Sequence, residues 1–278
     1  RDQDAATQVG PYLVTQNFGA RSGAGPFLTG VAYRDKDGDG MYSMGEGARG
    51  MKVALSGRGA DKSEAAGGYG LEPGEGIYDL TLSGKPVKGR IKAEIFVTQQ
   101  NAKLDLVDGK HLHTSADLDL KKGAASVTVL GAGDVDLSGK AGRDKLIGGA
   151  GANRLEGEGG RDKLIGGGGR DKLIGGNGDD QLKGGGGRDV FQFDARDGDD
   201  RILDWSEGDR LALSGKLTFA DVEIARHRGD ALLSFGDTAV TIEDQAGEIH
   251  RDDHVVGQKR QQPFTVVHAV GTGLDHQH

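Results

Sequence analysis

Acidic side chains that recur every nine residues are the part of this sequence best suited to chemistry. In six consecutive blocks between Gly139 and Gln192, a carboxylate or amide occupies the sixth position. These side chains are Asp144, Asn153, Asp162, Asp171, Asp180 and Asp189. Stacked carboxylates repel one another unless a hard cation lies between them, and calcium takes oxygen ligands of this kind. The spacing therefore predicts a series of calcium sites.

The rest of each block shows how these side chains would be positioned. The blocks read GKAGRDKLI, GGAGANRLE, GEGGRDKLI, GGGGRDKLI, GGNGDDQLK and GGGGRDVFQ, with glycine at positions 1 and 4, glycine in most copies at position 2, and a large apolar residue at position 8. We expect the apolar residues to stack into one inward column. A block from Leu130 to Ser138 keeps the register but has Val135 in place of the acid, so we expect no ion there.

The repeat resembles the calcium-binding nonapeptide G-G-x-G-x-D-x-U-x of RTX proteins. The resemblance implies a parallel β-roll in which two nonapeptides make one turn. Asp144, Asp162 and Asp180 would then stack on one side, and Asn153, Asp171 and Asp189 on the other. Each neighbouring pair would hold one Ca²⁺ ion, about four in the roll, with a weaker site at Asn153 because it carries no charge.

Glycine content bears on how the roll folds. Ordering glycine costs more conformational entropy than ordering any other residue, and each repeat offers only one large apolar side chain for burial. We therefore expect the repeats to be disordered without calcium and to fold when calcium binds.

A second calcium motif lies upstream. The segment DKDGDGMYSMGE fits a twelve-residue calcium loop, and its expected ligands are Asp35, Asp37, Asp39, the backbone carbonyl of Met41, and Glu46. The alternative is a hydrophilic turn rich in Asp and Gly. Its flanks indicate strands, so a helix–loop–helix is rejected. The loop and its surroundings resemble the calcium-loop β-sandwich modules of SdrD B-like or Cna B-like type.

Alternating apolar residues predict strands around this loop. They cover Phe27–Tyr33, Met51–Ser56, Gly76–Ser83, Gly89–Thr98 and Lys103–Val107. Short strands at this density predict a small antiparallel sandwich. Residues 109–126 are interpreted as a linker, in which His111 and His113 lack a third metal ligand.

The segment from Phe193 to Leu213 resembles the sequence that closes RTX rolls, which implies further calcium ligands. The candidates are Asp200, Asp204 and Asp209, and the alternative is an acidic capping turn. Two strands, Ala231–Phe235 and Thr238–Ile242, follow. This part resembles the β-rich caps of type I secreted proteins, which implies an uncleaved C-terminal export signal read by a type I transporter.

The predicted fold class is all-β: a small antiparallel β-sandwich, then a parallel β-roll with a β-rich C-terminal cap. The expected boundaries are 1–25 for the end of a missing upstream domain or a linker, 26–108 for the sandwich, 109–126 for the linker, 127–205 for the roll and 206–278 for the cap and secretion region. GPYLVTQNFG near the start resembles the end of bacterial CAP-type domains, and we expect the chain to be a fragment of a longer protein.

Composition excludes several classes of function. The net charge of −8 argues against a nucleic-acid partner, and the absence of cysteine excludes a disulfide scaffold and thiol chemistry. No apolar run approaches the roughly 20 residues of a membrane span. The sequence lacks H-E-x-x-H, G-x-S-x-G and G-K-[ST], so we expect no enzyme in this chain.

Two hypotheses of function remain. In the first, the chain is a calcium-binding protein, secreted by a bacterium of Gram-negative type, with a structural or adhesive role. In the second, it is the non-catalytic C-terminal part of a larger secreted enzyme or CAP-domain protein. The basic residues beside the repeat acids favour a solvated face, with anionic polysaccharide as the alternative partner.

Overall fold

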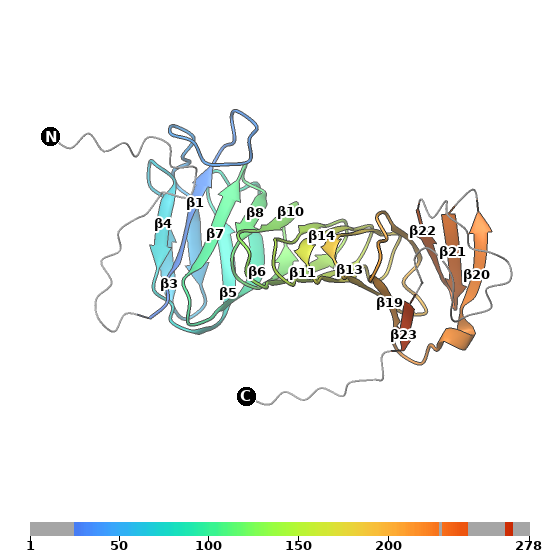
Figure 1. Ribbon diagram of the computed structural model, residues 1–278. Helices are drawn as coiled ribbons and strands as arrows, with labels where there is room; N and C mark the ends of the chain where they lie inside the picture. The colour runs from blue at the N-terminus through green and yellow to red at the C-terminus, as the bar shows by residue number, and fades with distance from the viewer. Residues whose placement is uncertain (1–24, 228–229, 244–264, 269–278) are drawn as a thin grey trace. The chain divides into compact units, whose positions relative to one another are not determined.

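The computed structural model describes residues 25–227, 230–243 and 265–268. The chain forms two compact units, residues 1–125 and 126–278. Figure 1 shows the strands of both and labels them where there is room. The expectations for residues 1–24, including the CAP-type segment, and for most of the tail after residue 243 lie outside the described residues.

The described part of the first unit, residues 25–125, contains nine short strands. They are β1 (Leu28–Tyr33), β2 (Lys52–Leu55), β3 (Gly59–Lys62), β4 (Gly68–Leu71), β5 (Gly76–Ser83), β6 (Ile91–Val97), β7 (Ala102–Val107), β8 (His111–Thr114) and β9 (Leu118–Lys122). One row of paired strands has the order β8–β7–β1–β4 and another the order β9–β6–β5–β2–β3. The alternation predicted for Ile91–Val97 is observed, with Ile91 and Ile95 fully buried and Lys92 exposed.

Two expectations for this unit are corrected. Residues 109–126 are not an irregular linker, because β8 pairs antiparallel with β7 and β9 pairs antiparallel with β6. Leu112, Leu118 and Leu120 are almost completely buried, and this burial outweighs the polar composition that suggested a linker. The pairing is also not wholly antiparallel, since β1 and β7 run parallel. The β-sandwich itself stays a prediction.

The second unit contains the repeats. Its strands are β10 (Ser126–Val129), β11 (Asp136–Ala141), β12 (Lys145–Ile147), β13 (Arg154–Gly159), β14 (Lys163–Gly169), β15 (Lys172–Ile174), β16 (Gln181–Gly187), β17 (Val190–Phe193), β18 (Asp199–Ile202), β19 (Arg210–Leu213), β20 (Glu223–His227), β21 (Asp230–Phe235), β22 (Thr238–Ile242) and β23 (Thr265–His268). A single 3₁₀ turn, η1 (Phe219–Asp221), is the one helical element among the described residues.

The repeat strands form a parallel β-solenoid with two faces. The even-numbered strands β10 to β18 pair in sequence on one face, and the odd-numbered strands β11 to β19 on the other. Within the repeats, from β11 to β17, partners are 18 residues apart, as in Leu146↔Leu164 and Leu155↔Leu173, so two nonapeptides make one turn. The predicted parallel roll is confirmed.

The predicted apolar column fills the interior of the roll. Each of its six side chains has 0% exposure: Leu146, Leu155, Leu164, Leu173, Leu182 and Phe191. Trp205 closes the column, with its ring centroid 5.9 Å from that of Phe191.

The segment after the repeats continues the roll before the chain reverses direction. Leu182 pairs with Ile202 and Phe191 with Leu211, so the period lengthens from 18 to 20 residues. Strand β22 then pairs parallel with β18, while β21 and β20 are antiparallel additions at the edge. No helix among the described residues is long and apolar enough to cross a membrane.

A candidate calcium ladder in the roll

The six predicted repeat ligands lie in two ladders, one on each side of the roll. In both ladders, one carboxylate oxygen accepts a hydrogen bond from the backbone N–H of the equivalent residue one turn earlier. On side one, the N–H groups of Asp144, Asp162 and Asp180 donate to Asp162, Asp180 and Asp200 at 2.7, 2.7 and 2.9 Å. On side two, the N–H groups of Asn153, Asp171 and Asp189 donate to Asp171, Asp189 and Asp209 at 2.8, 2.9 and 2.9 Å. The structure thus brings together the residues that the sequence grouped.

The second carboxylate oxygen of most ladder residues is buried without a partner. Five Oδ2 atoms are in this position within the described chain, those of Asp162, Asp171, Asp180, Asp189 and Asp200. A buried polar atom without a hydrogen bond costs about 1–3 kcal/mol, and more when it is charged. A row of such atoms fits a bound cation.

Glycine at the first position of the repeat makes room for these oxygens. A Cβ atom on Gly157, Gly166, Gly175 or Gly184 would lie 2.3–2.5 Å from the Oδ2 of the aspartate five residues later. A side chain at this position would displace the carboxylate. The aspartate can therefore keep its buried position only where the residue five positions earlier is glycine.

The electrostatics of the ladder also favour a cation. Burial raises the pKa of Asp162 to about 7, of Asp189 to about 6 and of Asp200 to about 8, and neighbouring carboxylates add to the increase. Burial likewise raises the pKa of Asp171 and Asp180. Bringing these groups together as carboxylates is unfavourable without a positive charge between them.

The first residue of each ladder differs from most of the later ones, because its side-chain polar atoms have partners within the chain. Asp144 has both oxygens occupied: Oδ2 accepts the N–H of Lys140 at 2.8 Å, and Oδ1 forms an ion pair with the Lys140 ammonium. Asn153, at the first level of side two, donates its amide to Gly151 O and to Asp171 Oδ1. Its oxygen accepts the N–H of Val135. Lys140 stands at position 2 of its repeat, where four of the six copies have glycine, and this departure was the signal that the sequence interpretation overlooked.

Of the three candidates in the closing segment, two extend the ladders. Asp200 continues side one with an unpartnered oxygen, and Asp209 continues side two, where its Oδ2 accepts hydrogen bonds from Ser206. Asp204 differs from these two, because its two oxygens accept the N–H groups of Gly184 and Gly185. Asp204 stays a predicted ligand, and these two hydrogen bonds also fit the alternative of an acidic capping turn.

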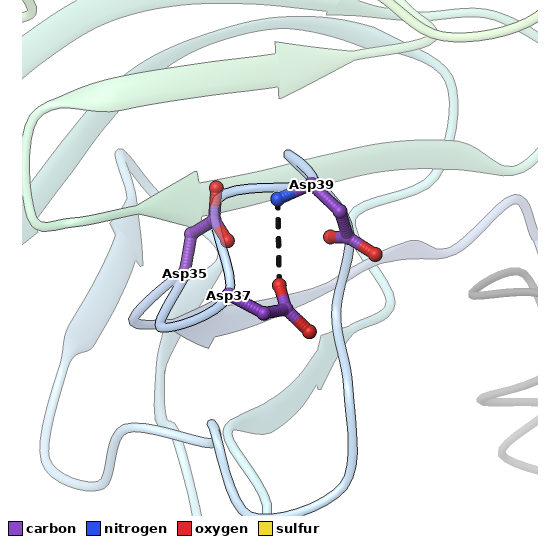
Figure 2. A group of neighbouring side chains, drawn as sticks. All are labelled: Asp35, Asp37 and Asp39. Atoms are coloured by element: carbon purple, nitrogen blue, oxygen red, sulfur yellow. Dashed lines mark hydrogen bonds between the residues drawn. The ribbon is translucent and has the colours of Figure 1, made fainter.

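The loop from Asp35 to Glu46 gathers three of its predicted ligands. Asp35, Asp37 and Asp39 each offer an oxygen within 4.8 Å of the others. Figure 2 shows the three side chains together on the loop. Asp35 accepts the N–H groups of Gly38 and Gly40 at 2.8 and 2.9 Å, which curls the loop around its carboxylate.

The remaining loop candidates are not part of that cluster. Glu46 is 4% exposed and accepts the N–H groups of Lys36 and Ser43 at 2.7 and 2.8 Å. Met41 follows Gly40 with an exposed side chain. Both residues stay predicted ligands.

The H-x-H pair lies on β8 rather than in a linker. Burial lowers the pKa of His113, and the charge of nearby Asp105 opposes that change. Within the described chain, neither His111 nor His113 belongs to a group of three side chains that could bind a metal.

The comparison with known protein families agrees with this geometry. Residues 131–164 and 157–191 match the family model of the RTX calcium-binding nonapeptide repeat. No curated protein matches the chain. Among solved structures, the chain is similar to extracellular lipase LipA from Serratia marcescens, with 22% identity, a TM-score of 0.31, and coverage of 74% of this chain and 30% of that chain. The chain thus spans less than a third of that lipase. Residues 131–191 are RTX calcium-binding nonapeptide repeats, and the chain is a protein that carries them in a parallel β-roll.

Proposed function

We propose that this chain is a secreted calcium-binding protein whose roll folds when calcium fills the two ladders outside the cell. The observation that supports this most directly is the set of five buried carboxylate oxygens without a partner. Bound calcium would place positive charge between the stacked carboxylates, and their oxygens would coordinate the ion. The unpartnered oxygens of Asp162, Asp180 and Asp200 would hold ions on side one, and those of Asp171 and Asp189 on side two.

The number and positions of these ions depend on which carboxylate oxygens already have a partner in the chain. The sequence alone suggested an ion between Asp144 and Asp162, but the Lys140 ammonium already contacts Asp144. At this first level of the ladder, the Lys140 ammonium supplies the positive charge that calcium would supply at the later levels. We therefore place the calcium sites from Asp162 onward, extending to Asp200, and assign one further ion to the Asp35 loop.

The cellular setting follows from calcium supply. Extracellular calcium modules bind at roughly 10⁻⁴–10⁻³ M, and the bacterial cytosol does not reach that concentration. The chain would stay unfolded inside the cell, pass through a type I transporter and fold on exit, with a structural or adhesive role afterwards. Removal of the last 60 or so residues should keep the protein inside the cell. Normal export of that truncation would refute the transport step.

Substitution in the middle of a ladder tests the calcium sites. In Asp180→Asn the carboxylate is lost but the shape is kept, so we expect calcium affinity to fall by at least about tenfold, which is about 1.4 kcal/mol. Isothermal titration calorimetry on the full chain measures it.

Asp179→Asn is the matched control. Its carboxylate is adjacent in sequence, half exposed, and paired with Arg161 on the surface. Surface ion pairs contribute little, so calcium binding should stay within about twofold of the unsubstituted chain. Equal losses in both variants would contradict the proposed sites.

A further inference from the structure

Basic side chains of the repeats are arranged differently on the two sides of the roll. At the turn position just before each ladder residue, side one carries Arg143, Arg161, Asp179 and Asp199, and Arg161 forms an ion pair with Asp179 at 2.6 Å. The same position on side two carries Ala152, Arg170, Arg188 and Gly208 beside the ladder residues, and its acid, Asp134, precedes Val135 before the first ladder residue. From Asn153 to Asp209, side two therefore has no acid at this position, whereas side one has two.

Four cations of side two surround one surface hollow. The hollow has a volume of about 240 Å³, and Arg170, Lys172, Arg188 and Arg210 line it together with Val190 and Gly208. The ladder residue Asp171 also borders it but is 1% exposed. Among the residues that the structure describes, none of the four cations forms a salt bridge, unlike Arg154 one level earlier, which is paired with Glu156.

The parallel register explains why the charges converge. Lys172 pairs with Val190 and Val190 with Arg210, so these three side chains form one row across three levels of the roll. Arg170 and Arg188 form a second row beside it, and the stem of Arg188 lies over Gly208, where a Cβ would come within 2.9 Å of its Cγ. Successive repeats lie on opposite sides of the roll, but these four bases all lie on side two and line the same hollow.

The shape and spacing indicate which anion fits. Neighbouring strands of a sheet lie about 4.8 Å apart, so positive charges recur along the roll at one-level and two-level intervals. Duplex DNA carries charge much more densely, at about 1.7 Å per phosphate. Single-stranded nucleic acid is usually held by aromatic stacking, whereas this lining contains no aromatic side chain and only one aliphatic side chain, Val190. Interfacial membrane binding would need more apolar surface than this.

We infer that side two of the roll binds an acidic polysaccharide, whose carboxylate or sulfate groups pair with Arg170, Lys172, Arg188 and Arg210. Guanidinium groups form paired hydrogen bonds with planar or tetrahedral oxyanions, which gives geometric selectivity as well as charge. The site goes beyond calcium binding but rests on it, because the hollow exists only when the roll is folded.

The test uses the calcium-loaded full chain and short oligosaccharides that cannot gel. Binding of hexagalacturonate, chondroitin sulfate hexasaccharide and neutral maltohexaose is measured by calorimetry. We expect one or both acidic hexasaccharides to bind and maltohexaose not to bind. Comparison of the two acidic probes separates carboxylate from sulfate recognition. In the variant Arg170→Gln/Arg188→Gln, affinity should fall by at least tenfold.

The matched control is Arg143→Gln/Arg161→Gln, which removes the same charge from the same repeat position on side one. Its affinity should stay within twofold. Equal losses in both double variants would reduce the effect to net charge and overturn the inference, as would tighter binding of anionic phospholipid vesicles or DNA than of either hexasaccharide. Circular dichroism of each variant in calcium distinguishes the two proposals. A folded roll that binds no hexasaccharide refutes the polysaccharide site alone, and a chain that calcium does not fold refutes the calcium proposal.

Discussion

At the scale of single residues, the ladders depend on which carboxylate oxygens have partners. The nine-residue spacing was enough to predict the ladder residues from Asp144 to Asp189. It could not predict that the Lys140 ammonium reaches Asp144, because that contact depends on the path of a long side chain. It also could not align Asp200 and Asp209 with the ladders, because the period lengthens to 20 residues after the repeats.

Lys140 provides a direct test at this scale. Lys140→Gln removes the ammonium and leaves the carboxylate of Asp144, which is almost fully buried, without a countercharge. We expect the variant to take up one more calcium ion than the unsubstituted chain, as counted by calorimetry. Lys145→Gln, at an exposed position of the same repeat, should not change the number. An unchanged count for Lys140→Gln would show that the lysine does not replace an ion.

The raised pKa values of the ladder predict how pH affects the calcium-free chain. The folded pKa values of Asp162, Asp189 and Asp200 are about 7, 6 and 8, above the value of 3.8 expected for an unfolded chain. Protons therefore favour the folded state, and this contribution is complete below about pH 4 and lost as pH rises through 6 to 8. Calcium needs the deprotonated groups, so its affinity should change in the opposite direction.

Circular dichroism in buffers stripped of calcium checks this prediction. We expect more β signal at pH 5 than at pH 8 without calcium, and a weaker calcium response at pH 5. A calcium-free β signal that increases with pH would contradict it.

At the scale of elements, the strands predicted from alternation are the ones observed, with shifts of one or two residues at several ends. β3 and β4 were missed because GADK and GYGL are short and rich in small or polar residues, and β8 and β9 because polar and charged residues outnumber leucine in HLHT and LDLKK. Their strand character comes from pairing with neighbours that are distant in sequence. Local composition does not contain that information.

The turns of the roll depend on glycine at specific places. Gly187 has φ of 139°, and a Cβ on it would lie 1.5 Å from the carbonyl oxygen of Gly169 one turn earlier. We expect Gly187→Ala to destabilise the calcium-bound roll by more than the roughly 1–3 kcal/mol of backbone strain alone. Urea unfolding in calcium measures this.

The adjacent Gly186→Ala is the control for that variant. No atom lies within 4 Å of the Cβ it would add, and its φ is outside the left-handed region. Its free energy of unfolding should stay within about 1 kcal/mol of the unsubstituted chain, as for most unstrained surface changes. Equal effects at the two positions would mean that the turns do not stack as described.

At the scale of the whole molecule, the predicted calcium sites fall into two compact units. The Asp35 loop belongs to residues 1–125 and the ladders to residues 126–278. The first unit has an ordinary apolar core, including Leu82, Ile91, Ile95 and Leu106. The roll has one fully buried large apolar side chain per repeat and buries five unpartnered carboxylate oxygens. Only the second unit should therefore require calcium in order to fold, and the loop should titrate separately.

A calcium titration of the full chain, followed by far-ultraviolet circular dichroism, tests the central claim most directly. The predicted result is a large cooperative gain of β signal between EGTA and millimolar calcium, in addition to a calcium-independent β signal from the first unit. The same β content in EGTA and in calcium would contradict the account, because the roll would then fold without the cations that its buried carboxylates require.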